Sequence, residues 1–285
     1  VTATPDKQCC YDCCLQWVCC MGNSLSVAPA RWSVGTPEHT ALAQQAQGFR
    51  EISATWRRMT TNSIWIPLVS KSTFSEAAPN TSWWFDDARW EILLDNWGVA
   101  AAVAQNSSAT QLFIDAEEYC QYCPPGGKCH EASSLTEISN CTLFFYPDLV
   151  LFSNRTFVEY EAIARQRGTE LLLTLVAAWP ALHEISLTHG FGTVQRSIRR
   201  LPPGGDRVQN LSLVEYGLLP AFLDGIMIGM HQAETAAVVT NGLPSPPLPR
   251  LYLTENYENY FLKTRADFQS AFDMAKRGGA SLRKH

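Results

Sequence analysis

The sequence has little charge and no long hydrophobic run. Only 17% of the 285 residues are charged, and the net charge is −5 with an isoelectric point near 5.7. A protein that neutralises nucleic-acid phosphates needs a basic stripe, so this balance argues against a nucleic-acid partner. No apolar run reaches the roughly 18 residues that a membrane-spanning helix requires. We therefore expect neither a nucleic-acid-binding protein nor a membrane span.

Two signatures of common enzyme classes are also missing. No strand-to-helix turn carries the glycine fingerprint that binds a dinucleotide, so we expect no nucleotide cofactor. No Ser/His/Asp nucleophile elbow is found. The chain begins at Val1, with neither an initiator methionine nor a signal peptide, which is typical of a mature or trimmed product. The sequence is 46% hydrophobic, which is enough to build the core of one large globular domain.

Cysteine is unusually abundant, and the even count of ten fits a disulfide framework in an oxidising compartment. The ten are Cys9, Cys10, Cys13, Cys14, Cys19, Cys20, Cys120, Cys123, Cys129 and Cys141. Adjacent cysteines rarely bond each other because the geometry is strained, so we expect each doublet to pair with two other places. The last four loosely resemble zinc-ligand spacing, which is the alternative interpretation.

Five N-x-[ST] sequons favour the disulfide interpretation over the zinc site. Residue frequencies would give about one or two in a chain of this length. The sequon asparagines are Asn80, Asn106, Asn140, Asn154 and Asn210. Glycosylation acceptors belong on secreted surfaces, and secretion favours disulfides. We therefore expect a secreted, extracellular glycoprotein that carries N-linked glycans, with no metal and with its disulfide connectivity open.

The most informative stretch is an apolar run, residues 112–114, that leads directly into Asp115, Glu117, Glu118 and Tyr119. The run is short and bounded, which is typical of a buried parallel strand. Carboxylates at the end of such a strand are costly to bury unless they serve a purpose. Side chains alternate along a strand, so Asp115 and Glu117 project to one side, where each raises the pKa of the other. The alternative is an acidic, solvated loop.

Strand and helix patterns alternate along the chain, which predicts a β/α barrel of the eight-stranded TIM type, incomplete as counted. The expected strands lie near residues 15–19, at 63–69, 112–115 and 185–188, within 216–229, and at 250–254. The expected helices begin at Thr36, near Trp90, at Thr156 (with a Glu159 capping box), at His231 and at Thr264. We assign residues 1–30 to a Cys-rich N-terminal segment and residues 31–285 to the barrel-like domain.

Polar side chains follow two later expected strands. His189 comes after the strand at 185–188, and Glu255, Tyr257 and Glu258 follow the strand at 250–254. In a sheet of parallel strands, ligands bind at the carboxyl ends. For each of these residues, the alternative to a role in ligand binding is that of a structural or solvated side chain.

An aromatic pair, Trp83 and Trp84, lies beside two aspartates. Flat apolar faces of sugars stack on indoles, so the pair could form a sugar platform. The alternative is that both rings belong to the core.

Several segments resemble a family of uncharacterised, glycoside-hydrolase-like TIM-barrel proteins known mainly from bacterial genomes. Residues 113–119 (FIDAEEY) are similar to its Phe-Asp-x-Glu-x-Tyr strand end, and residues 255–258 (ENYE) to its Asp-Gly-Tyr-Glu strand end. Residues 216–225 and 187–192 also resemble family segments, in the same order. The resemblance covers roughly residues 60–277. The Cys-rich N-terminus, the cysteine-bearing loop at 120–141 and the early end of the chain depart from the family pattern.

The resemblance implies a carbohydrate-active site, and glycoside hydrolysis needs two carboxyl groups that flank the scissile bond. We assign Glu117 as the general acid, Asp115 as the group that tunes its pKa, and Glu258 as the opposing carboxylate, with Glu255 in reserve.

The remaining candidates would bind substrate. Tyr119, His189 and Tyr257 would orient sugar hydroxyls, and Trp83 and Trp84 would stack a ring. The alternative function is a non-catalytic extracellular glycoprotein on a hydrolase-like scaffold, either a carbohydrate-binding module or a subunit of a homo-oligomer or extracellular assembly.

Overall fold

One parallel sheet organises the part of the chain that the structure, a computed structural model, describes. The described residues are 16–20, 31–55, 61–67, 83–107, 109–116, 121–122, 130–131, 144–150, 153–188, 194, 198, 201, 203–214, 216–241, 249–254 and 269. The sheet has five strands, paired in chain order: β1 (Gln16–Cys20), β2 (Thr61–Pro67), β3 (Gln111–Asp115), β6 (Glu184–Thr188) and β7 (Arg250–Thr254).

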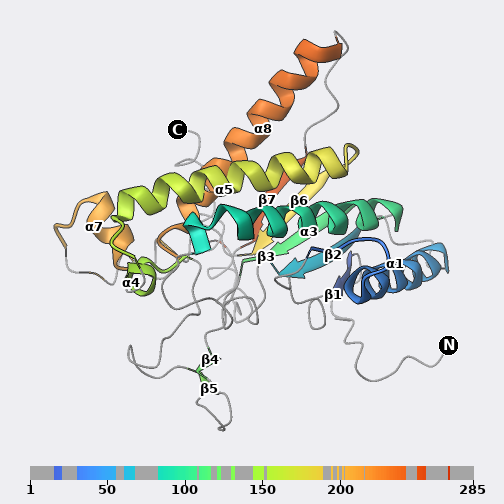
Figure 1. The fold of residues 1–285 in the computed structure, drawn as a ribbon, viewed down its shortest axis with the longest axis horizontal. Coiled ribbons are helices and arrows are strands. Elements are labelled where there is room, and N and C mark those ends of the chain that lie inside the picture. The colour runs from blue at the N-terminus through green and yellow to red at the C-terminus, as the bar shows by residue number, and fades with distance from the viewer. Residues whose placement is uncertain are drawn as a thin grey trace.

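Four long helices connect these strands; in Figure 1 the fourth, α8, crosses the third, α5, at an angle and projects beyond it. They are α1 (Pro37–Thr55), α3 (Asp87–Asn106), α5 (Phe157–Ala178) and α8 (Leu219–Asn241). A right-handed crossover to the next parallel strand places its helix on the same face each time, because the strand order never reverses. The short elements are the 3-10 turn η1 (Trp83–Phe85), α4 (Tyr146–Leu149), α7 (Arg207–Ser212) and the antiparallel pair β4 (Gln121–Tyr122) and β5 (His130–Glu131).

The prediction of an eight-stranded barrel is wrong. The described residues are mostly helical, and they contain one parallel sheet of five strands in which β1 and β7 stand at opposite ends of the strand order. The strand within the Cys-rich segment is real, since β1 pairs with β2. Alternation of strands and helices predicts a parallel sheet correctly, but it does not fix the number of strands or make the sheet close.

One further expected strand, within residues 216–229, is also wrong, because this stretch belongs to α8. Leu219, Phe222, Leu223 and Ile226 are buried and follow the helical spacing i, i+3, i+4, i+7. The separate helix expected from His231 is the second half of the same helix. Short apolar runs do not distinguish a buried strand from a buried helix, and here tertiary packing decides.

Helices α5 and α8 approach each other through glycines. A Cβ atom on Gly225 would overlap the carbonyl oxygen of Arg165, and one on Gly168 would overlap that of Phe222. The hydroxyl of Thr169 donates to the carbonyl oxygen of Gly225 at 2.9 Å. Glycine inside a helix costs up to about 1 kcal/mol in conformational entropy. The close packing of α5 on α8, which a Cβ atom at either position would prevent, offsets this cost.

A buried guanidinium joins α5 to η1 and α3. Arg167 donates from Nε and Nη2 to the carbonyl oxygen of Trp84 at 3.2 and 3.1 Å, and from Nη1 to Glu170 at 2.9 Å. It also pairs with Asp87, and its guanidinium lies 5.4 Å from the ring centre of Trp90. A charge is tolerated at such a buried position because hydrogen bonds and acidic partners surround it.

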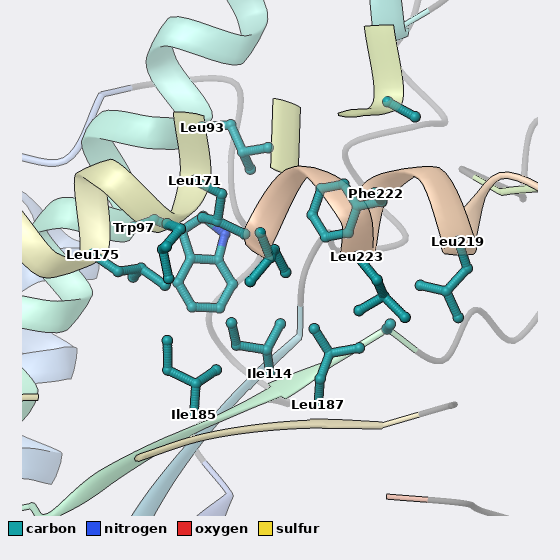
Figure 2. Packing of buried hydrophobic residues seen from close by; sticks show 14 of the residues in the cluster. Leu93, Trp97, Ile114, Leu171, Leu175, Ile185, Leu187, Leu219, Phe222 and Leu223 are labelled. Carbon is teal, nitrogen blue, oxygen red and sulfur yellow. The ribbon is translucent and has the colours of Figure 1, made fainter. Parts of the chain in front are cut away.

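The main core lies between the helices and the sheet. Figure 2 shows Ile114, Ile185 and Leu187 pointing from β3 and β6 toward Trp97 of α3 and Leu223 of α8. Side chains alternate along a strand, so the residues between these, such as Phe113 and Ser186, belong to the opposite face of the sheet.

Replacing Gly225 with alanine should destabilise the protein by about 1–3 kcal/mol or more, because the added methyl group meets backbone that cannot move aside. Gly48 is the matched control: it lies inside α1, and a methyl group added there would meet nothing within 4 Å, so Gly48→Ala should stabilise by roughly 0.5–1 kcal/mol. Urea unfolding of the two variants measures both effects. Equal effects in the two variants would contradict close α5–α8 packing.

The predicted capping box at the start of α5 is present, and it gives an acid-dependent contribution to stability. The backbone N–H of Thr156 donates to Glu159 at 2.8 Å, and this bond, followed by those from Arg155 and the Thr156 hydroxyl, lowers the pKa of Glu159 from 4.5 to about 2. A lowered folded-state pKa means that the stabilisation is fully present above pH 4.5 and is lost as the pH falls toward 2.

The stability difference between the native protein and Glu159→Gln should therefore shrink as the pH falls from about 4.5 to about 2, where the native carboxylate becomes protonated. Denaturant unfolding at several pH values across this window measures the difference. A difference that stays constant with pH would show that the charge of Glu159 contributes nothing.

Candidate functional site at the carboxyl edge of the sheet

Parallel pairing brings the carboxyl ends of the strands to one edge. The register pairs Pro67 of β2 with Asp115 of β3, and Thr188 of β6 with Thr254 of β7. Neighbouring strands in a sheet are about 4.8 Å apart, so the ends of β3 and β7, with β6 between them, lie about 10 Å apart. Segments that leave these strands begin close together, as ligand sites in parallel sheets require.

Asp115 is the described acidic residue at this edge. It is the last residue of β3 and only 8% exposed. Leu112 and Ile114 are buried in the core between sheet and helices, so Asp115 belongs to the opposite face of the strand. Ligands of parallel sheets bind at the carboxyl ends of the strands, so the position of this carboxylate makes Asp115 a candidate site residue.

Two rows of side chains cross this second face of the sheet. Phe113, Ser186 and Tyr252 occupy successive register positions on β3, β6 and β7, and Tyr252 is 44% exposed. The row nearer the amino ends consists of Gln111, Glu184 and Arg250. Gln111 is buried, so the accessible groups of this face are the exposed Tyr252 and Arg250 and the partly exposed Ser186 and Glu184. An aromatic ring beside hydrogen-bonding groups is the combination that holds a sugar ring and its hydroxyls.

Sequence reasoning did not single out Tyr252, although the signal was present. Arg250 and Tyr252 alternate with Leu251 in an expected strand, which predicts that they face away from the core. The buried Arg167 was also missed. It follows Tyr160 and Ala164 at positions i, i+4 and i+7 on the apolar stripe of α5, where a charge is out of place without partners.

The other residues predicted at this edge lie outside the described residues: Glu117, Tyr119, His189, Glu255, Tyr257 and Glu258. Their sequence positions are still informative, because each follows the last residue of β3, β6 or β7 by no more than four residues. The segments that follow β3, β6 and β7 therefore all begin at the carboxyl edge of the sheet. The roles of these residues stay predictions.

Trp84 belongs to the core. Its ring is fully buried and stacks on Trp90 with centroids 5.4 Å apart, while Phe144 and Phe222 pack on it at 5.8 and 6.2 Å. The indole is therefore not accessible for the predicted stacking on a sugar. For Trp83 the structure describes the backbone within η1 only, and its predicted role stays a prediction.

The sequons fall into different environments. Asn154 is exposed in the non-helical segment before α5, and Asn106 is exposed as the last residue of α3. Asn210 lies within α7, where its side-chain amide donates to the carbonyl oxygen of Gly205 at 2.9 Å. Asn80 and Asn140 lie outside the described residues.

The predicted disulfides stay predictions. Cys9, Cys10, Cys13, Cys14, Cys120, Cys123, Cys129 and Cys141 lie outside the described residues, and only the backbone of Cys19 and Cys20 is described, in β1. Within the described ranges, no group of three or more His, Cys, Asp or Glu side chains is placed to hold a metal ion. No helix in the same ranges is long and apolar enough to cross a membrane.

Comparison with known proteins adds no relative. No protein-family model matches the chain, and searches of curated proteins and of solved structures gave no match. The resemblance to glycoside-hydrolase-like proteins therefore stays a prediction that rests on the short motifs quoted above.

The sequon environments predict which sites carry glycans when the chain is expressed in a eukaryotic secretory host. Asn154 should be modified because it is exposed in non-helical backbone, whereas Asn210 should be modified little because its amide is bonded within a helix. Peptide mass spectrometry after enzymatic deglycosylation measures occupancy at each site. Full occupancy at Asn210 with none at Asn154 would contradict this assignment.

Proposed function

We propose that this protein is a secreted glycoprotein that hydrolyses glycosidic bonds in a polysaccharide or glycan at the carboxyl edge of its sheet. The observation that carries the proposal is the position of Asp115, a carboxylate that is 8% exposed at the end of a central parallel strand. Ligands of parallel sheets bind at the carboxyl ends of the strands, and a carboxylate at this position supports the proposal.

In the proposed mechanism, Glu117 is the general acid. It follows Asp115 by two residues, and like-charge repulsion between the two carboxyl groups favours the protonated form of one of them. Protonated Glu117 donates its proton to the leaving glycosidic oxygen as the bond to the anomeric carbon breaks. In this proposal Asp115 tunes the pKa of Glu117 through this repulsion.

The opposing carboxylate in this proposal is Glu258, with Glu255 in reserve. It either attacks the anomeric carbon, and water later hydrolyses the glycosyl–enzyme bond, or it takes a proton from a water molecule that attacks this carbon directly. Glu258 and Glu255 both follow β7, whose end lies about 10 Å from the end of β3 by strand spacing. Glycosidases place their two carboxyl groups roughly 5–10 Å apart, the shorter separations giving retention and the longer ones inversion. The strand arrangement is compatible with this range, and side chains from either strand can close part of the distance.

Substrate contacts come from the same edge and from the second face of the sheet. Tyr119, His189 and Tyr257 orient sugar hydroxyls, and Trp83 stacks a ring. Tyr252, exposed in the row with Ser186 and Phe113, adds an aromatic surface that the motifs alone do not indicate. An aromatic ring beside hydroxyl donors suits the apolar face and polar rim of a sugar.

The alternative is a non-catalytic extracellular glycoprotein that binds carbohydrate or assembles with copies of itself. The exposed Tyr252 and its polar neighbours favour this alternative equally, because they support binding without any chemical step. The two functions differ in turnover, so one set of variants separates them.

A hydrolysis screen against a broad glycan panel tests the proposal. Glu117→Gln should lower kcat by about 10²–10⁴-fold, the usual contribution of a general acid. Its loss should be smaller on an aryl glycoside with an acidic leaving group, which departs without a proton. Asp115→Asn should also lose activity. Glu234→Gln, on an exposed position of α8, is the matched control and should retain activity.

Two results would contradict the hydrolase. The first is activity in Glu117→Gln equal to that of the native protein. The second is no turnover by the folded native protein on any glycan, and glycan binding under these conditions would establish the non-catalytic alternative.

A further inference from the structure

We propose that a separate sugar-binding position lies on the open face of β6 and β7, and that the substrate of the proposed site is therefore an extended, neutral polysaccharide. Four side chains form this position, and we name them the β6–β7 quartet: Glu184, Ser186, Arg250 and Tyr252. The inference rests on the proposed function, because it assumes that carbohydrate binds beside Asp115.

The register of the two strands brings the quartet together. Glu184 pairs with Arg250, and Ser186 pairs with Tyr252. On each strand the residue between the two members packs in or against the main core, so all four members belong to the opposite face of the sheet. The backbone N–H of Arg250 donates to the carbonyl oxygen of His183 at 2.7 Å, which fixes the beginning of β7 against β6.

The quartet is accessible and is not engaged elsewhere. Tyr252 is 44% exposed, Arg250 is exposed, and Glu184 and Ser186 are partly exposed. In the part of the chain that the structure describes, no hydrogen bond or ion pair engages any of the four side chains. This holds even for Glu184 and Arg250, whose opposite charges face each other in register. Hydrogen-bond donors, acceptors and an aromatic ring therefore remain available to a ligand at one place.

These groups match one sugar ring. The Tyr252 ring offers a flat surface to the apolar C–H face of a sugar, while the guanidinium, carboxylate and hydroxyl of the other three members donate to and accept from its hydroxyl groups. The charges of Arg250 and Glu184 offset each other, and the whole chain carries a net charge of −5. A polyanion gains little attraction from such a surface, so the ligand that fits is neutral.

The distance to Asp115 determines the length of the ligand. Asp115 belongs to the same face of the sheet, at the end of β3, and β6 lies between β3 and β7. From the spacing of strands and the rise per residue, the centre of the quartet lies roughly 12 Å from Asp115. A single sugar unit is too short to contact both places, so a chain that does so has further units between them.

An array of immobilised oligosaccharides tests the proposal on the full chain. The array carries monosaccharides, disaccharides, tetrasaccharides and hexasaccharides of neutral hexoses, of N-acetylhexosamines and of uronic acids. The native protein should bind the tetrasaccharides and hexasaccharides of an uncharged series, and the shorter members much less. Tyr252→Ala should weaken this binding by about tenfold, because the stacking surface is lost. Leu213→Ala is the control, because Leu213 is 60% exposed at the end of α7, and it should bind like the native protein.

Three results on the array would overturn the proposal. They are equal binding of monosaccharides and hexasaccharides, unchanged binding by Tyr252→Ala, and absence of binding to every uncharged series. Preference for the uronic acids would overturn the assignment of a neutral ligand.

Two variants of Arg250 test the neutral ligand further. Arg250→Gln keeps hydrogen-bond donors and removes the charge, whereas Arg250→Ala removes both. On uncharged oligosaccharides, Arg250→Ala should weaken binding by about threefold to tenfold, and Arg250→Gln should lose clearly less. Equal losses in the two variants would show that the ligand is recognised through the charge, which contradicts a neutral sugar.

The array does not require turnover, so the two proposals can fail separately. Length-dependent binding that Tyr252→Ala weakens, without hydrolysis, would support the β6–β7 position and contradict the hydrolase. Hydrolysis with the same kcat/KM on short and long oligosaccharides would support the hydrolase and overturn the β6–β7 position.

Discussion

The contact between α5 and α8 is the constraint on which the helical layer depends. Gly168 and Gly225 let the two backbones come so close that the Thr169 hydroxyl reaches the carbonyl oxygen of Gly225 across the interface. On another side of α5, Arg167 binds the carbonyl oxygen of Trp84 and pairs with Asp87. One helix thereby fixes both of its neighbours, and breaking a buried charge network of this kind typically costs about 3–5 kcal/mol. This contact also helps to place Leu223 of α8 over Ile114 of β3 and Leu187 of β6 in the core (Figure 2).

The parallel sheet determines which segments of the chain meet at its carboxyl edge. Because the strands are parallel and paired in chain order, the segments after β3, β6 and β7 all start at the same edge and within about 10 Å of one another. The helical layer buries one face of the strands, which leaves the other face for Asp115, Ser186 and Tyr252. The proposed site thus combines a sheet edge fixed by packing with a buried carboxylate, Asp115, and an exposed aromatic ring, Tyr252.

Much of the local structure could be predicted from the sequence, because the signals were local. The Thr156 cap with Glu159, and the strands before Asp115 and His189, were recognisable from neighbouring residues. The stretch around Ile226 was misjudged as a strand because a short apolar run with glycines fits either structure. The helical spacing of its buried residues was present in the sequence, and packing against Gly168, distant in the chain, favours the helix. The prediction of a barrel was wrong because closure of a sheet depends on pairing between strands that are distant in the chain, and local sequence patterns do not indicate such pairing. Asp115 was identified correctly as a residue at a strand end, whereas Trp84 became a core residue through contacts with Trp90, Phe144 and Phe222, which lie far apart in the chain.

The central claim is that carbohydrate binds at the carboxyl edge of the sheet, beside Asp115. The most direct measurement is a crystal structure of the Glu117→Gln variant in complex with an oligosaccharide that the native protein binds or hydrolyses. The account predicts a sugar ring between the ends of β3 and β7, with its scissile oxygen near residue 117 and Asp115 beneath the ring. A ligand bound elsewhere on the molecule, with the edge beside Asp115 closed by the protein itself, would contradict it.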